Sequence, residues 1–211
     1  MPRKSKNIYE LADEIIKEPV KVSKRKTYVK ADINILTNAG RDSTPDRNLL
    51  LAQKWKLNLF FFLKEFWNET TPDGFEDAPH IEFICKELQF AGKRVIERQK
   101  KASDIIINLP PGTTKTTILI SFCAWLIAND PSIAILWGSY SYDLSKDKAE
   151  KIKNIIRSEK YQKYFPAVKI KQGSDSKQHY EFTALGEVAI TSPDSMATGK
   201  HFDLICIDDG Q

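Results

Sequence analysis

Short runs with an apolar interior, alternating with helical segments, constrain the fold of this chain more than any other feature. Three such runs occupy residues 104–108 (DIIIN), 133–138 (IAILWG) and 204–207 (LICI). A strand that is apolar on both faces is typical of a parallel sheet whose strands are connected through helices. Helical patterns at residues 116–129 and 144–158 supply such connections. The alternation predicts an α/β sandwich with a mainly parallel sheet covered on both faces.

Further helices are predicted before this sandwich in the sequence, and further strands near the end of the chain. Helical spacing covers residues 48–68 and 81–99, which we expect to form a helical extension ahead of the first strand. Three shorter strands are predicted near the end of the chain, the last two joined as a hairpin through Gly186: residues 168–171, 179–183 and 187–190. The chain then divides into an N-terminal arm, residues 1–45, and one domain, residues 46–211.

The arm is basic, although the net charge of the whole chain is only +4. Its basic side chains crowd the first thirty positions: Arg3, Lys4, Lys6, Lys21, Lys24, Arg25, Lys26 and Lys30. A flexible basic arm suits contact with phosphates through counterion release. A solvated terminus with no partner is the alternative, and it stays open.

The overall composition indicates a protein of the cytoplasm. Hydrophobic residues make up 41% and charged residues 28%, as in ordinary globular proteins. Cys85, Cys123 and Cys206 are far apart, without the spacing of a zinc site or a disulfide framework. Neither a signal peptide nor a run of eighteen apolar residues is found, so we expect no membrane contact.

A phosphate-binding loop is predicted between the first apolar run and the helix after it. Residues 109–117 read LPPGTTKTT, a loop that leads through Lys-Thr into a helix, which is the context of a Walker A motif. The inward N–H groups of such a loop and the helix dipole attract phosphates. Strict motifs have glycine where Leu109 and Thr114 stand, so Thr114 would be strained if its φ is positive. A proline-rich turn that binds nothing is the alternative.

Each residue of this loop receives an expected role. The predicted ATP-binding residues are Pro111, Gly112, Thr113, Thr114, Lys115, Thr116 and Thr117. Lys115 would reach the β- and γ-phosphates as a catalytic charge, and the hydroxyl of Thr116 would bind Mg²⁺.

The last apolar run ends in two acids, as a Walker B strand does. Asp208 is expected to hold Mg²⁺ opposite Thr116, and Asp209 to orient or deprotonate the attacking water as a catalytic residue. An acidic turn that ends a core strand is the alternative. The two motifs together predict a P-loop NTPase with a three-layer sandwich, using ATP and Mg²⁺.

With both motifs in place, residues 48–211 resemble the ATPase domain of the large terminase subunit of tailed bacteriophages. The resemblance begins with residues 106–117 (IINLPPGTTKTT), and some members of the family also lack glycine before the lysine. Further matching phrases follow in order: Ala124-Trp125, Asn129-Asp130-Pro131, residues 138–141 with Asp143-Leu144, Ile155-Ile156, Ser158, Tyr161, Tyr164-Phe165-Pro166 and residues 198–201.

The resemblance implies a motor that uses ATP to drive double-stranded DNA into a prohead. Its implied partners are the DNA, the portal protein and the small terminase subunit, and its implied assembly is a homo-oligomeric ring at the portal. The family's coupling segment and nuclease domain would follow Gln211, so we expect a domain incomplete at its C-terminus, without nuclease activity.

Gly112 stands where many members of the family carry arginine, so an arginine finger must come from elsewhere. Arg157 is the candidate for this catalytic role, and a solvated helix charge is its alternative. Three other functions stay open: an inactive truncated P-loop fragment, a helicase-like nucleic-acid ATPase, and a protein-binding module on a degenerate loop.

Overall fold

The structure is a computed structural model, and it describes residues 47–192 and 200–208. The predicted arm of residues 1–45 and the predicted catalytic residue Asp209 lie outside these ranges. The helices of the described parts are α3 (Arg47–Leu57), α4 (Leu59–Phe66), the 3₁₀ helix η1 (Trp67–Glu69), α5 (Pro79–Ile96), α6 (Lys115–Asn129), α7 (Tyr142–Arg157) and α8 (Glu159–Tyr164). The strands are β1 (Ala134–Ser139), β2 (Ile170–Asp175), β3 (His179–Phe182), β4 (Glu187–Thr191) and β5 (Leu204–Asp208).

The five strands form one mixed sheet in the order β2-β3-β4-β1-β5. β1 is parallel to both β4 and β5, whereas β3 is antiparallel to both β2 and β4. The connections from β2 to β3 and from β3 to β4 are too short for a crossover, which takes about a dozen residues, so these strands can only form hairpins. The predicted hairpin through Gly186 is therefore present.

All described helices that touch the sheet cover the same face of it. Alternate residues of the strands point to this face, and Trp137, Tyr180 and Cys206 on it are buried. α7 packs along β1 and β4, where the Tyr180 hydroxyl donates to the carbonyl of Ala149 at 3.1 Å. The Sγ atoms of Cys123 on α6 and Cys206 on β5 lie 3.8 Å apart.

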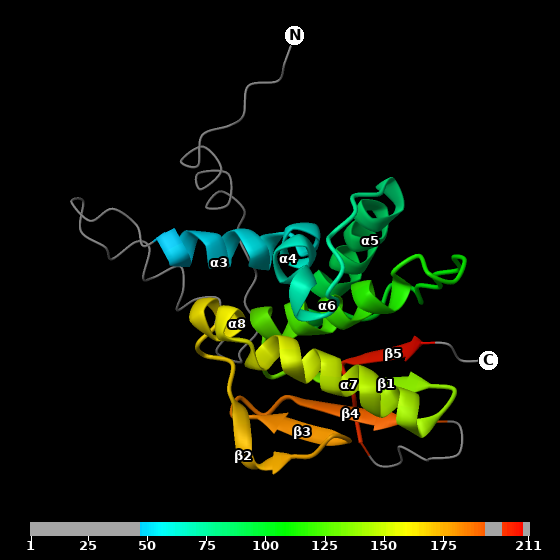
Figure 1. The fold of residues 1–211 in the computed structure, drawn as a ribbon. Helices are drawn as coiled ribbons and strands as arrows, with labels where there is room; N and C mark the ends of the chain where they lie inside the picture. The colour runs from blue at the N-terminus through cyan, green and yellow to red at the C-terminus, as the bar shows by residue number, and fades with distance from the viewer. Residues whose placement is uncertain (1–46, 193–199, 209–211) are drawn as a thin grey trace.

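The helices α3, α4 and α5 form an outer layer on α6 rather than on the sheet (Figure 1). The indole N–H of Trp125 on α6 donates to the carbonyl of Trp55 on α3 at 3.0 Å. Gly92 on α5 lies so close to α6 that an added Cβ would stand 2.7 Å from the Trp125 ring. The order of layers is helices, helices and sheet, and α6 is buried because it lies in the middle.

The predicted P-loop NTPase three-layer sandwich with a mainly parallel sheet is wrong for this structure, which is a small α/β domain with a mixed sheet. Residues 104–108 form no strand, and the Ile106 side chain is 90% exposed. On the sheet face away from α7, Ile205 and Ile207 are 60% and 69% exposed. An apolar run forms a strand only where a neighbouring edge accepts its hydrogen bonds, and the described residues give 104–108 no such neighbour.

The predicted helices and the other predicted strands are present, with shifted ends. The helix predicted over residues 48–68 is interrupted at Asn58, whose side chain accepts a hydrogen bond from the N–H of Phe61 and caps α4. In the described ranges, no helix is both long and apolar enough to cross a bilayer.

Candidate phosphate-binding site

The loop that precedes α6 curls through two residues with a left-handed backbone. Gly112 has φ +79° and Thr114 has φ +64°. Glycine adopts this conformation freely, whereas a β-branched residue is strained there by roughly 1–2 kcal/mol. The positive φ under which the sequence predicted strain at Thr114 is therefore present. Thr114 lies directly before Lys115, the first residue of α6.

Short side-chain hydrogen bonds hold the loop closed. The ammonium of Lys115 donates to the carbonyl of Leu109 at 2.6 Å, across the width of the loop. The hydroxyl of Thr113 donates to the carbonyl of Pro110 at 2.6 Å. The ammonium of Lys115 therefore lies against the loop. The N-terminus of α6, which is the positive end of the helix dipole, adjoins the same loop.

Asp208, the predicted metal ligand on the last strand, contacts the first turn of α6. The hydroxyl of Thr116 lies 3.0 and 2.9 Å from the two carboxylate oxygens of Asp208, although the residues are 92 positions apart. Asp208 is the last residue of β5, and its partner in the parallel register is Ser139, the last residue of β1. Its side chain is buried, and the contact ties the first turn of α6 to the carboxyl end of the sheet.

The residue types present fit Mg²⁺ and a polyphosphate. Mg²⁺ prefers oxygen ligands and is bound through one or two carboxylates plus phosphate oxygens, and Thr116 and Asp208 offer a hydroxyl and a carboxylate side by side. Within the described residues, no group of three or more His, Cys, Asp and Glu side chains is placed to hold a metal ion by itself. A metal bound here would therefore depend on oxygens from the substrate.

The structure brings most of the predicted site residues together. Lys115, Thr116 and Thr117 form the first turn of α6, and the other predicted ATP-binding residues form the loop directly before it: Pro111, Gly112, Thr113 and Thr114. Ser139 was not among the predicted site residues. Its buried hydroxyl accepts a hydrogen bond from the Trp137 indole at 3.2 Å, beside Asp208 at the sheet edge.

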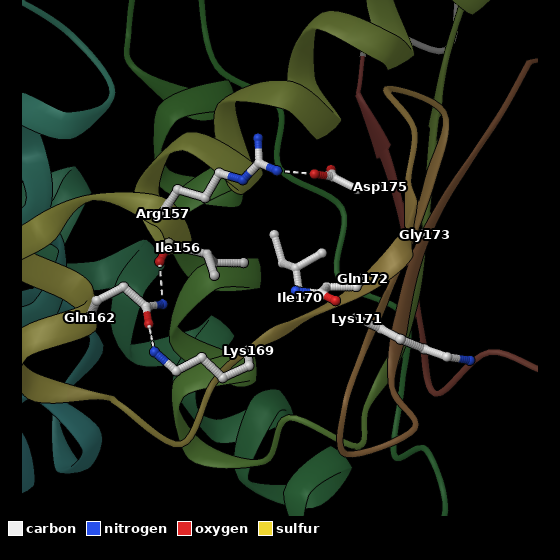
Figure 2. A pocket seen from close by; sticks show the side chains of 9 residues that line it. All are labelled: Ile156, Arg157, Gln162, Lys169, Ile170, Lys171, Gln172, Gly173 and Asp175. Atoms are coloured by element: carbon white, nitrogen blue, oxygen red, sulfur yellow. Dashed lines mark hydrogen bonds and ion pairs between the residues drawn. The ribbon is translucent and has the colours of Figure 1, made fainter.

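Arg157, the candidate arginine finger, lies far from the phosphate loop of its own chain. α7 begins at Tyr142, shortly after β1 ends beside Asp208, and Arg157 is its last residue. Fifteen steps of 1.5 Å along the helix separate these ends by roughly 22 Å. Arg157 forms an ion pair with Asp175 at the opposite edge of the sheet (Figure 2).

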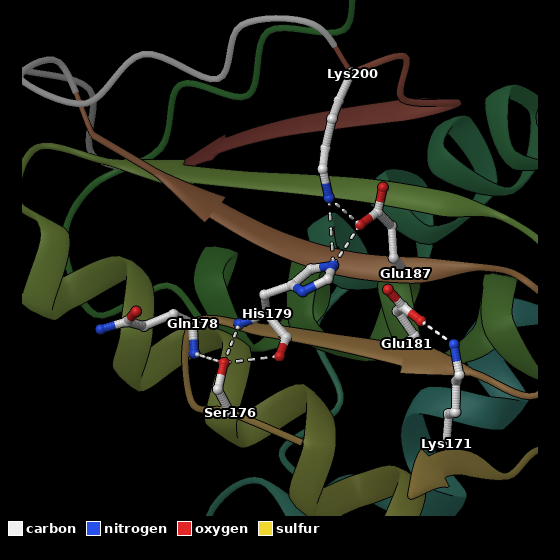
Figure 3. Close-up of polar contacts among 7 residues, drawn as sticks. All are labelled: Lys171, Ser176, Gln178, His179, Glu181, Glu187 and Lys200. Atoms are coloured by element: carbon white, nitrogen blue, oxygen red, sulfur yellow. Dashed lines mark hydrogen bonds and ion pairs between the residues drawn. The ribbon is translucent and has the colours of Figure 1, made fainter. Parts of the chain in front are cut away.

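A separate polar cluster occupies the uncovered face of the sheet. The Oε2 of Glu187 lies 2.5 Å from Nε2 of His179 and 2.7 Å from the ammonium of Lys200 (Figure 3). Burial raises the pKa of Glu187, but the hydrogen bonds from Lys200 and His179 outweigh it, so the pKa is lowered. The cluster fixes the chain ahead of β5 to β4 and takes no part in the phosphate loop.

Comparisons with protein-family models, with curated proteins and with solved structures gave no match to this chain.

Proposed function

We propose that this chain binds ATP together with Mg²⁺ at the loop before α6, and hydrolyses the nucleotide. The observation that carries the proposal is the meeting of Thr116 and Asp208 at 2.9–3.0 Å, beside a loop whose Leu109 carbonyl accepts from the ammonium of Lys115. A site of this kind is recognised by its geometry and chemistry rather than by the surrounding fold.

The loop and Lys115 would bind the phosphates. The N–H groups at the start of α6 have no partner within the helix, and the helix dipole favours an anion beside them. The ammonium of Lys115 would exchange the neutral carbonyl of Leu109 for a charged phosphate oxygen, which is the stronger partner. This exchange needs a rotation of the lysine side chain and no movement of α6.

Thr116 and Asp208 would hold the metal ion. Mg²⁺ held there would neutralise the negative charge that develops on the phosphates during transfer. The hydroxyl of Thr116 and the carboxylate of Asp208 would supply its oxygen ligands from the protein. Asp209 remains the sequence-based candidate for orienting the attacking water.

The biological role we propose is that of a motor domain in viral DNA packaging. It is supported by the resemblance of residues 48–211 to the large terminase subunit. The expected partners are double-stranded DNA, the portal protein and the small terminase subunit, with the motor acting as a ring at the prohead in the host cytoplasm.

The test is a measurement of Mg-ATP binding and turnover by the purified chain and its Lys115→Ala variant. We expect the variant to lose turnover by about 10²–10³-fold, the size of effect seen when one charge-stabilising donor is removed from an active site. Lys86→Gln removes a lysine from the exposed side of α5 and serves as the matched control, with unchanged turnover expected.

Equal turnover in Lys115→Ala and in the unaltered chain would show that the loop binds no reacting phosphate. Weak binding without turnover in every variant would favour an inactive P-loop fragment. DNA-stimulated hydrolysis would support a motor, and strand separation without a prohead would support the helicase-like alternative.

A further inference from the structure

A basic pocket lies at the far edge of the sheet, between the end of α7, α8 and the edge strand β2 (Figure 2). Its volume is about 440 Å³, within the range of small-molecule sites. Its lining combines three basic side chains with one acid, two amides and an apolar floor: Ile156, Arg157, Gln162, Lys169, Ile170, Lys171, Gln172, Gly173 and Asp175. The pocket includes none of the phosphate-loop residues.

The single carboxylate of the pocket does not neutralise Arg157, because a buried lysine shares it. Asp175 forms ion pairs with both Arg157 and Lys153, the latter at 3.1 Å from Nζ to Oδ1. The Lys153 side chain is only 4% exposed and so needs this partner. Asp175 therefore balances one of the two cations, and one positive charge remains at Arg157, whose side chain is 52% exposed.

Lys169 adds a second unbalanced charge to the same pocket. The hydrogen bond that the structure gives its ammonium goes to the amide oxygen Oε1 of Gln162 at 2.6 Å, which is a neutral acceptor. Lys171 differs, because its ammonium pairs at 2.8 Å with Glu181 of the neighbouring strand β3. The pocket thus carries a surplus of two positive charges, from Arg157 and Lys169.

The wall that presents these charges is held in place by backbone contacts. The amide nitrogen of Gln162 donates to the carbonyls of Ile156 and Val168 at 2.7 and 3.0 Å, which fixes the direction of its Oε1. Ile156 below it is fully buried. A fixed wall lowers the ordering cost of binding, so the two cations are partly preorganised.

We propose that this pocket binds a phosphorylated ligand at two places, Arg157 and Lys169. Two surplus cations suit a ligand that carries more than one negative charge. The guanidinium of Arg157, on the side of Asp175, can contact two oxygens of one phosphate group, and the ammonium of Lys169, on the side of Gln162, can contact a second phosphate group (Figure 2). The site is independent of the proposed ATP site, which lies at the other end of α7.

Both a free phosphorylated molecule and a nucleic-acid backbone carry this group, and a binding experiment separates them. Inorganic pyrophosphate and a short single-stranded oligonucleotide are titrated separately into the chain at low salt. All titrations use a Lys115→Ala background, because the phosphate loop would itself bind pyrophosphate. Failure of the ATP site would leave this measurement unaffected.

We expect Arg157→Gln and Lys169→Gln each to weaken binding of the recognised probe by about tenfold or more, as for loss of a hydrogen bond to a charged group. Lys86→Gln, with the same loss of charge outside the pocket, should change affinity less than about twofold, because exposed charges at a distance are screened by salt. Binding of pyrophosphate alone would identify a free phosphate as the ligand, and binding of the oligonucleotide would identify a backbone.

The proposal is overturned if neither probe binds at millimolar concentration. It is also overturned if the pocket variants and Lys86→Gln weaken binding equally, which would indicate only non-specific attraction to a basic surface. Thermal unfolding of each variant checks that the fold survives, and the exposed position of both side chains predicts little change in stability.

Discussion

The two ends of the parallel strands β1 and β5 are held together in different ways. At their amino ends the guanidinium of Arg98 contacts Asp203 at 2.5 Å, Asp130 at 3.1 Å and the Ser132 hydroxyl at 2.9 Å. At their carboxyl ends the hydroxyl of Thr116, in the first turn of α6, lies against the carboxylate of Asp208. The first end is held by a network of ion pairs, and the second includes the hydroxyl–carboxylate contact at which we propose a metal ion.

This difference distinguishes an end of the sheet that is tied by ion pairs from the end at which we propose the phosphate site. Asp203 also accepts a hydrogen bond from the N–H of Ala134 at 2.9 Å, and its contact with Arg98 joins the end of α5 to the start of both strands. The pKa of Arg98 is raised, because its two carboxylate partners outweigh its burial. We expect changes at the amino ends to alter stability, and changes at the carboxyl ends to alter phosphate chemistry.

The largest expected effect is at the carboxyl end, from Asp208→Asn. The change keeps the size of the side chain but removes the charge that would hold Mg²⁺, so ATP turnover should fall by about 10²–10³-fold. Turnover is measured over a range of Mg²⁺ concentrations, and thermal unfolding should change little. A large loss of stability with normal turnover would reverse the distinction between the two ends.

Gly186→Ala tests the amino end through packing. An added Cβ would lie 2.4 Å from the carbonyl oxygen of Pro131 and 2.6 Å from that of Ile133, so the backbone must move. We expect a loss of about 1–3 kcal/mol in the free energy of unfolding, typical of overpacking. Urea unfolding provides the measurement. Gly74→Ala is the control, because nothing lies within 4 Å of its added Cβ.

Arg98→Gly tests the network at the amino end. Arg98 has φ +55°, which suits glycine, so the change removes the guanidinium without straining the backbone. Asp130 and Asp203 would lose their cation, at an expected cost of about 1–2 kcal/mol in the free energy of unfolding. An unchanged midpoint in urea would show that the network is not the structural tie of this end. Arg98→Lys should retain part of the stability.

Thr114→Gly removes the strained backbone at the phosphate loop. Relief of the left-handed conformation should stabilise the chain by about 0.5–1 kcal/mol, since the greater freedom of glycine in the unfolded state offsets part of the gain. Leu185→Gly, at φ +73° in the hairpin between β3 and β4, is the matched control. Both variants should raise the melting temperature, and only Thr114→Gly should alter nucleotide binding.

The smallest expected effect comes from Glu187 on the uncovered face. Its pKa is lowered from the usual 4.5, so it contributes stability above that pH and loses the contribution as the pH falls through the lower folded value. Glu187→Gln should therefore destabilise the chain near neutral pH and bring no loss at lower pH. Urea unfolding from pH 7 down to pH 3 measures this, with Glu69→Gln on η1 as the control.

The sequence predicted which residues meet at the carboxyl edge of the sheet better than it predicted the layers of the fold. The loop residues and Asp208 follow local patterns, in which a strand end and a helix start bring polar groups to one edge, and these patterns depend on few distant contacts. The run at residues 104–108 reads like a strand, but pairing depends on a neighbour that the run itself does not specify. The same isoleucines would be present whether the run forms a paired strand or an unpaired segment, so the sequence alone could not distinguish these two structures.

Which face of the sheet a helix covers also depends on contacts between segments that are distant in the sequence. Helical spacing predicted α6 and α7 but not that both lie on the same face, because each helix has apolar residues enough for several arrangements. The charge balance of the pocket beside β2 was beyond sequence reasoning as well. It arises from Lys153, Arg157 and Asp175, which meet only after β2 folds back against α7.

The contact between Cys123 on α6 and Cys206 on β5 provides a way to measure how often these two elements separate. Burial raises the pKa of the Cys123 thiol, so alkylating reagents can attack it only when α6 separates from β5. The same separation parts Thr116 from Asp208, since these residues lie on the same two elements. The alkylation rate of this thiol pair therefore measures how often the predicted metal ligands are apart, and a ligand that bridges them should slow the reaction.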